Sequence, residues 1–101
     1  MKKSNAWKSL ERKVAKELGG KRVYRGRNFA ESLPDVFHPL FTIECKSRKK
    51  GIPKFVTDGL DQAAKYDKNK IPLLVMKVKS KHGEIACLPF KDLVALYNID
   101  Y

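Results

Sequence analysis

The chain has 101 residues, 43% of them hydrophobic, with 22 basic against 11 acidic residues and a formal charge of +11. This length predicts one domain, residues 1–101, with a small core that a homodimer would help to bury. The charge predicts salt-dependent attraction to a polyanion, and nucleic acid is the partner that it favours. A basic surface that serves solubility alone is the alternative.

Membrane and zinc-binding roles find no support in the sequence pattern. We see no signal peptide, no stretch of transmembrane length and no basic amphipathic helix with a bulky apolar face, and we therefore expect a cytoplasmic protein without a membrane partner. Cys45 and Cys87 have no histidine nearby, which makes them a poor zinc site. We expect two buried thiols rather than a disulfide, as in a reducing cytoplasm.

The first half of the chain predicts one helix followed by strands. A helix is indicated by apolar residues at helical spacing, and it should end at Gly19-Gly20. These apolar residues are Trp7, Leu10, Val14, Ala15 and Leu18. Residues 21–25 predict a short strand, residues 26–33 a polar loop, residues 34–37 a second strand and residues 40–46 a third. The turns contain His38 and His82, which we expect to be exposed and outside any mechanism.

The second half predicts a helix, two strands and a last helix. A helix that starts near Thr57 or Asp58 follows a basic turn at residues 47–51. Residues 71–79 form an apolar run that is continuous enough for a central strand, and residues 83–88 predict the next strand. Pro89 precedes the last helix. The chain is therefore an α/β fold of order αβββαββα, a mixed sheet flanked by helices, with a right-handed crossover between the third and fourth strands.

Asp35 and the tripeptide Glu44-Cys45-Lys46 carry the chemistry. Alternation along a strand puts Glu44 and Lys46 on one face and Cys45 on the other. If the residues between them form a hairpin, Asp35 lies on the neighbouring strand. Two carboxylates and an ammonium would then converge, which suits metal-dependent cleavage of a phosphodiester.

Glu-x-Lys spacing alone proves little, because this composition predicts about two such spacings by chance. The chain contains Glu11-Arg12-Lys13 and Glu44-Cys45-Lys46. The first lies in a helical pattern, where residues two apart do not face each other. The second lies on an apolar, strand-like run with an acid upstream at hairpin distance, and this context singles it out.

The ordered set of motifs resembles the PD-(D/E)xK nuclease superfamily, and more narrowly the archaeal-type Holliday junction resolvases and their phage relatives. The matching pieces span most of the chain. They are Glu11, the strand at residues 23–25 with the Gly- and Arg-bearing loop after it, Pro34-Asp35, the run at residues 43–49 and residues 61–63. The Glu-x-Lys-Ser-Arg-Lys stretch is the most specific piece.

The resemblance implies a site for Mg²⁺ or Mn²⁺ held by Glu11, Asp35 and Glu44, with the Cys45 backbone carbonyl as a further ligand and Lys46 completing the site. The residue chemistry agrees, because carboxylate oxygens suit hard cations. Lys46 would orient a water molecule or offset developing charge. Each residue has an alternative: Glu11 as a solvated helix acid, Asp35 as a turn residue, and Glu44 with Lys46 as an ion pair on an exposed sheet.

Further residues are expected to help the site or to bind DNA. Gln62 would orient Lys46 or touch DNA, with a plain surface glutamine as the alternative. Arg25 and Arg27 are suited to clamp phosphates, unless they are only an exposed pair. Ser32 resembles a loop serine of some resolvases, although the loop here is shorter than the family pattern. The basic turn after the third strand suits a duplex backbone and comprises Arg48, Lys49, Lys50 and Lys54.

The resemblance implies an endodeoxyribonuclease that resolves four-way DNA junctions by metal-assisted hydrolysis, in the cytoplasm of a prokaryote or of a phage host. A C2 homodimer with two active sites matches the twofold symmetry of such a junction. No base-reading motif and no small-molecule substrate are expected, so backbone shape and charge should guide binding. The alternatives are another nuclease of the superfamily, nicking, repair or restriction-like, and a non-catalytic nucleic-acid-binding protein.

Overall fold

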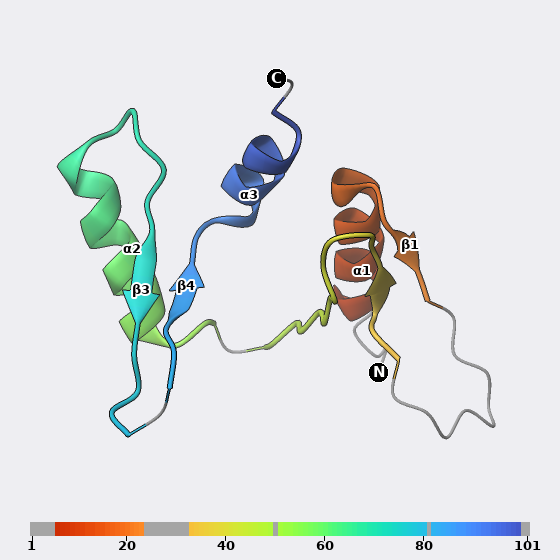
Figure 1. The fold of residues 1–101 in the computed structure, drawn as a ribbon, viewed down its shortest axis with the longest axis horizontal. Coiled ribbons are helices and arrows are strands. Elements are labelled where there is room, and N and C mark those ends of the chain that lie inside the picture. Colours follow the sequence, from red (N-terminus) through yellow and green to blue (C-terminus); the bar gives the residue numbers. More distant parts are fainter. Residues whose placement is uncertain (1–5, 24–32, 50, 81, 100–101) are drawn as a thin grey trace. The chain divides into compact units, whose positions relative to one another are not determined.

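The computed structural model describes residues 6–23, 33–49, 51–80 and 82–99. They belong to two compact units, Met1–Arg48 and Lys49–Tyr101. Within the described residues the order is helix, two strands, helix, two strands and helix, which can be followed along the chain in Figure 1. The predicted α/β alternation is confirmed at this level. None of the helices in these ranges is long and apolar enough to cross a bilayer.

The first unit begins with α1 (Ala6–Leu18), an amphipathic helix. Its buried residues, spaced so that they share one face, are Glu11, Val14 and Leu18. The helix ends in a Schellman motif, in which Gly19 has a left-handed φ of 73° and the Gly20 N–H donates to the Ala15 carbonyl at 2.8 Å. The predicted stop at Gly19-Gly20 is confirmed, and glycine suits it because it lacks the Cβ that disfavours positive φ.

A short antiparallel pair covers the buried face of this helix. β1 (Lys21–Arg22) pairs with β2 (Val36–Phe37), with Arg22 opposite Val36. Directly opposite residues of an antiparallel pair share one face of the sheet, so Arg22 and Val36 both lie on the side of α1. The buried apolar side chains of this unit are Val14, Leu18 and Val36.

A β-bulge lies at the start of β2. Val36 forms an antiparallel bridge with Ile43, and the Asp35 N–H also donates to the Ile43 carbonyl at 2.8 Å. Two consecutive residues thus face one partner, which is the arrangement of a bulge. A regular strand sends neighbours to opposite faces, whereas Asp35 and Val36 are both buried. The bulge therefore lets a carboxylate lie on the same side as the core valine.

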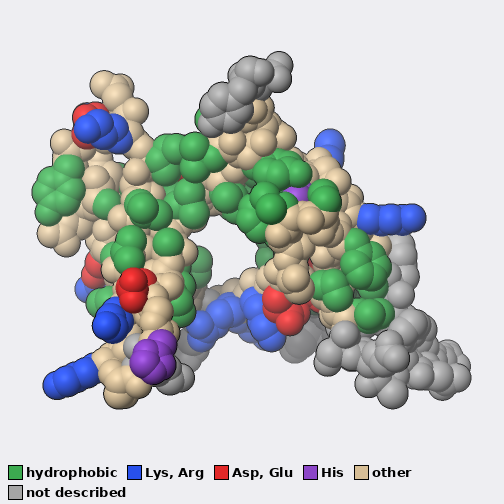
Figure 2. All heavy atoms as spheres, in the orientation of Figure 1, with side chains coloured by type: hydrophobic (Ala, Val, Ile, Leu, Met, Phe, Trp, Pro, Cys, Tyr) green, Lys and Arg blue, Asp and Glu red, His purple; other side chains and the backbone are tan. Residues whose placement is uncertain are grey.

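The second unit packs a helix on a hairpin. β3 and β4 are antiparallel, and α2 packs against β3. The elements are α2 (Lys54–Tyr66), β3 (Leu74–Met76), β4 (Ile85–Cys87) and α3 (Phe90–Tyr97). Leu74 faces α2 at Gly59. Along the other face of the β3 segment, Ile71, Leu73 and Val75 stay exposed. Figure 2 shows hydrophobic side chains, coloured green, at several places on the visible surface.

The structure corrects the predicted start of α2. The helix begins at Lys54, directly after Pro53, whose carbonyl accepts the Val56 N–H at 2.9 Å. The Thr57 hydroxyl does not cap the helix but donates to the Lys54 carbonyl at 3.2 Å, within the first turn. Proline suits this position because it has no N–H to leave unpaired and its φ is already helical. The same reasoning predicted Pro89 before the last helix, and that prediction is confirmed.

The observed strands are shorter than the strands that the apolar runs of the sequence predicted. A ladder forms only where a partner faces the chain. Of the described residues 21–23, two belong to a strand, and of residues 71–79, three do. The third predicted strand, residues 40–46, is reduced to the bridge at Ile43. The described strands form two antiparallel sheets of two strands each. Within the described sheet, β3 pairs with one strand, β4. Alternate residues of β3 are covered, whereas a central strand has both of its faces covered.

His38 is not the exposed bystander that its turn position predicted. Its Nε2 donates to the Leu18 carbonyl at 2.9 Å, and its Nδ1 accepts the Leu40 N–H at 3.0 Å. One nitrogen must then carry the hydrogen while the other accepts, which describes a neutral imidazole. The ring also lies 5.1 Å from that of Phe41. His38 therefore satisfies the last carbonyl of α1, a group that a helix end leaves unpaired.

We expect Gly20→Ala to destabilise the protein by about 1–3 kcal/mol. A Cβ there would lie 2.7 Å from the Phe37 carbonyl oxygen and from Val36 Cγ1, and the backbone of a paired strand has little freedom to move. Gly59→Ala is the matched change, because its Cβ would meet only the movable end of Leu74 at 2.8 Å, and alanine favours a helix. Urea denaturation measures both, and equal midpoints would contradict the close approach at Gly20.

Candidate active site

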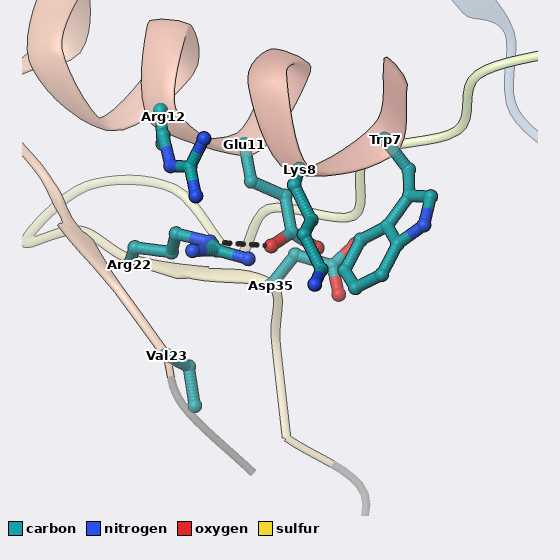
Figure 3. A pocket seen from close by; sticks show the side chains of 7 residues that line it. All are labelled: Trp7, Lys8, Glu11, Arg12, Arg22, Val23 and Asp35. Atoms are coloured by element: carbon teal, nitrogen blue, oxygen red, sulfur yellow. Dashed lines mark hydrogen bonds and ion pairs between the residues drawn. The ribbon is translucent and has the colours of Figure 1, made fainter. Parts of the chain in front are cut away.

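Two of the predicted acids meet in one pocket of the first unit. Glu11 of α1 and Asp35 at the bulge line a pocket of about 380 Å³. Both are nearly buried, with 7% and 6% of their surfaces exposed. Figure 3 shows Glu11 extending from the helix toward the side on which Asp35 lies. The other side chains that line this pocket are Trp7, Lys8, Arg12, Arg22 and Val23.

Glu11 is held by an ion pair. The Arg22 Nε donates to Glu11 Oε1 at 2.8 Å, and only 13% and 9% of the two side chains are exposed. Carboxylates that are nearly buried need charge-matched hydrogen bonds to offset lost hydration. Arg22 therefore fixes the position of the Glu11 carboxylate at the pocket wall, a contact drawn as a dashed line in Figure 3.

Asp35 is held by the backbone of the Glu-x-Lys segment. The Cys45 N–H donates to Asp35 Oδ2 at 2.6 Å. The bulge places Asp35 on the buried side, and the hairpin brings residue 45 to it. The predicted proximity of Asp35 to this segment is thus present, and the contact that achieves it is a backbone N–H to a carboxylate.

Glu44 and Lys46 flank Cys45 in the sequence. Both are exposed, while Cys45 between them is half-buried. This alternation agrees with the predicted faces of the segment. Burial raises the pKa of the Cys45 thiol, and the negative charges of Asp35, Glu11 and Glu44 raise it further, in that order. Glu44 is exposed and is the neighbour of Cys45 in the sequence, whereas Asp35 and Glu11 are buried.

We expect the pKa of Cys45 to fall in an Asp35→Asn variant, because a negative charge that disfavours the thiolate is removed. The measurement is the midpoint of the pH profile of alkylation in metal-free buffer, in a Cys87→Ser background where Cys45 alone reacts. The midpoint separates thiolate formation from simple access to the sulfur. Glu17→Gln, an exposed change of the same charge on α1, should leave the midpoint in place, and an unmoved midpoint in Asp35→Asn would contradict the clustering.

The acids fit a hard divalent cation by their chemistry. Glu11 and Asp35 offer carboxylate oxygens to one pocket, and oxygen ligands are those that Mg²⁺ and Mn²⁺ prefer. Across the residues that the structure describes, no group of three or more His, Cys, Asp and Glu side chains is arranged to hold a metal ion. Glu44 would have to turn inward to join the two buried acids.

Comparison with protein-family models, with curated proteins and with solved structures found no match to this chain. The site is therefore interpreted from its own residues.

The other predicted residues are not among those that line the pocket, or they lie outside the described residues. Gln62 of α2 is in the second unit, where its Nε2 donates to the Tyr66 hydroxyl at 3.3 Å. Arg48 and Lys49 are exposed at the boundary between the units, and Lys54 is exposed at the start of α2. The predicted residues that lie outside the described ranges are Arg25, Arg27, Ser32 and Lys50.

Five residues that line the pocket were not among the predicted site residues: Trp7, Lys8, Arg12, Arg22 and Val23. Helical spacing was the available signal for the first three. Trp7 and Lys8 precede Glu11 by four and three residues, and Arg12 lies four residues after Lys8, so all are near the Glu11 face. Arg22 has no such signal, because the face on which a strand residue lies depends on the register of its strand.

Proposed function

We propose that this protein is a metal-dependent endodeoxyribonuclease of the PD-(D/E)xK type that cuts four-way DNA junctions. One observation carries the proposal: Glu11 and Asp35 are buried together in one pocket, and Asp35 accepts the backbone N–H of Cys45, the residue between Glu44 and Lys46. Clustered carboxylates repel one another unless a cation is near. The charge of +11 supports a polyanionic substrate.

The proposed roles follow from the contacts. Glu11, Asp35 and Glu44 would hold Mg²⁺ or Mn²⁺, with the Cys45 carbonyl as a further ligand. The ion would supply Lewis-acid activation of the scissile phosphate. Arg22 keeps Glu11 in place, and the Cys45 N–H keeps Asp35 in place. Lys46, exposed beside Glu44, would orient the attacking water or offset charge on the phosphate.

The junction specificity and the dimer belong to the same proposal. Resolution of a four-way junction needs paired cuts in opposing strands, which a C2 dimer with two sites can make. The described elements support a fold of mixed helices and strands, and the single mixed sheet of the nuclease core is part of the proposal. The exposed apolar row of Ile71, Leu73 and Val75 is a surface of the kind that sheets bury against a neighbour.

The test is cleavage of a labelled four-way junction beside a linear duplex of the same sequence, with Mg²⁺ or with chelator. We expect paired cuts near the branch point that need the metal, while the duplex stays intact. Cleavage of the duplex at an equal rate would indicate another nuclease of this type. Tight junction binding without cutting under Mg²⁺ or Mn²⁺ would refute the enzyme and leave a DNA-binding protein.

A further inference from the structure

An exposed tryptophan lines the pocket that contains the two acids. Trp7 is the only tryptophan of the chain, and 45% of its surface remains exposed. It does not join Val14 and Leu18 in the core of the unit. Figure 3 shows its indole at one end of the pocket, beside Lys8, and Asp35 lines the same pocket. A large aromatic surface is thus kept available to a molecule that enters the pocket.

Cationic side chains accompany this ring. Lys8 Nζ lies 5.2 Å from the centroid of the Trp7 ring, and Arg12 lines the same pocket. With Arg22 they give the lining three cations against the two acids. Arg22 is engaged with Glu11, whereas Lys8 and Arg12 are on the α1 side of the pocket. A ring with a neighbouring ammonium is the combination that binds a nucleotide, with the base on the aromatic surface and the phosphate on the cation.

The spacing on α1 connects this surface with the acids. Trp7 and Glu11 are four residues apart, hence slightly more than one helical turn, or about 6 Å along the axis. A nucleotide stacked on Trp7 would therefore lie next to the carboxylates rather than across the molecule from them. Bases inside a duplex are stacked on each other and offer no free face, so the ring selects an unpaired base.

We propose that Trp7 is a stacking platform for an unpaired nucleobase and that Lys8 binds a phosphate of the same strand. The inference rests on DNA being the substrate, as proposed above, but not on its cleavage. At a branched DNA, Trp7 would hold an unpaired nucleotide next to Glu11 and Asp35. Trp7 would thereby give the protein a preference for unpaired bases, in addition to the recognition of DNA through its backbone charge.

The single tryptophan makes the inference directly measurable. A short single-stranded thymidine oligonucleotide, labelled with a dye that does not absorb tryptophan emission, is titrated in chelator. Anisotropy reports binding and indole fluorescence reports stacking. The same backbone built from abasic spacers is the matched ligand. We expect quenching with the thymidine oligonucleotide and not with the abasic one, and about tenfold weaker binding of the abasic ligand.

Variants separate stacking from charge and from folding. Trp7→Ala should weaken binding of the thymidine oligonucleotide about tenfold, while Trp7→Phe, which retains an aromatic face, should keep most of the affinity. Lys8→Ala should lose more affinity than Lys16→Ala, an equal charge change at an exposed position of the same helix. Circular dichroism confirms that each variant is folded.

The outcomes distinguish this inference from the proposed function. Binding without quenching, or equal affinity for thymidine and abasic strands, would overturn the role of Trp7 alone. Quenching by single strands together with no cleavage of any junction would support Trp7 and refute the nuclease. Absence of all DNA binding would overturn both.

Discussion

Asp35→Asn is expected to slow junction cleavage by at least about 100-fold while leaving junction binding intact. Asparagine has the same shape, and its carbonyl oxygen can still accept the Cys45 N–H that Asp35 Oδ2 accepts at 2.6 Å. The fold should therefore persist. What is lost is the negative charge that would hold a cation beside Glu11. Binding should tighten slightly, because one charge that repels phosphate is gone.

The measurement is single-turnover cleavage of a labelled junction, with the affinity measured separately in chelator. Glu17→Gln is the matched control, since Glu17 is an exposed acid on α1 that pairs with Lys13 at 4.0 Å. It should cut and bind like the wild type. Glu44→Gln should reproduce the cleavage defect of Asp35→Asn. A cleavage rate in Asp35→Asn close to that of the wild type would remove Asp35 from the site, and joint loss of binding and solubility would make it a structural residue.

The sequence was sufficient for the elements whose signals are local. The apolar spacing of α1 and the glycines at its end predicted the helix and its stop, because both depend on neighbours along the chain. The hairpin between Asp35 and Glu44 followed from the turn at His38-Pro39 and the apolar runs around it. The predicted nearness of Asp35 to the Glu44-Cys45-Lys46 segment depended on that turn and needed no knowledge of the rest of the fold.

The sequence was insufficient where the packing of one element on another decides. Strict alternation would have put Asp35 and Val36 on opposite faces, and the bulge against Ile43 overrides it. The role of His38 depends on where the end of α1 lies, 20 residues earlier in the chain. The same limit applies to Arg22, which an alternating pattern would not mark as a partner of Glu11.

Arg22→Met is expected to lower the free energy of unfolding by about 3 kcal/mol. Arg22 and Glu11 form an ion pair in which 13% and 9% of the side chains are exposed, so removing the cation leaves a carboxylate without its partner and away from water. The stability of a domain is about 5–15 kcal/mol, so this loss is large. Urea denaturation at neutral pH measures it.

Lys13→Met provides the comparison, because it breaks an ion pair on the same helix between side chains that are 61% and 40% exposed. We expect a loss of at most about 0.5 kcal/mol there. The double variant Glu11→Leu with Arg22→Met should recover most of the stability lost in Arg22→Met, since no charge is then left unpaired. Equal effects of Arg22→Met and Lys13→Met would mean that water reaches Glu11 freely. The carboxylate would then be a solvated helix acid, and the two acids would no longer share a protected pocket in which a cation is favoured.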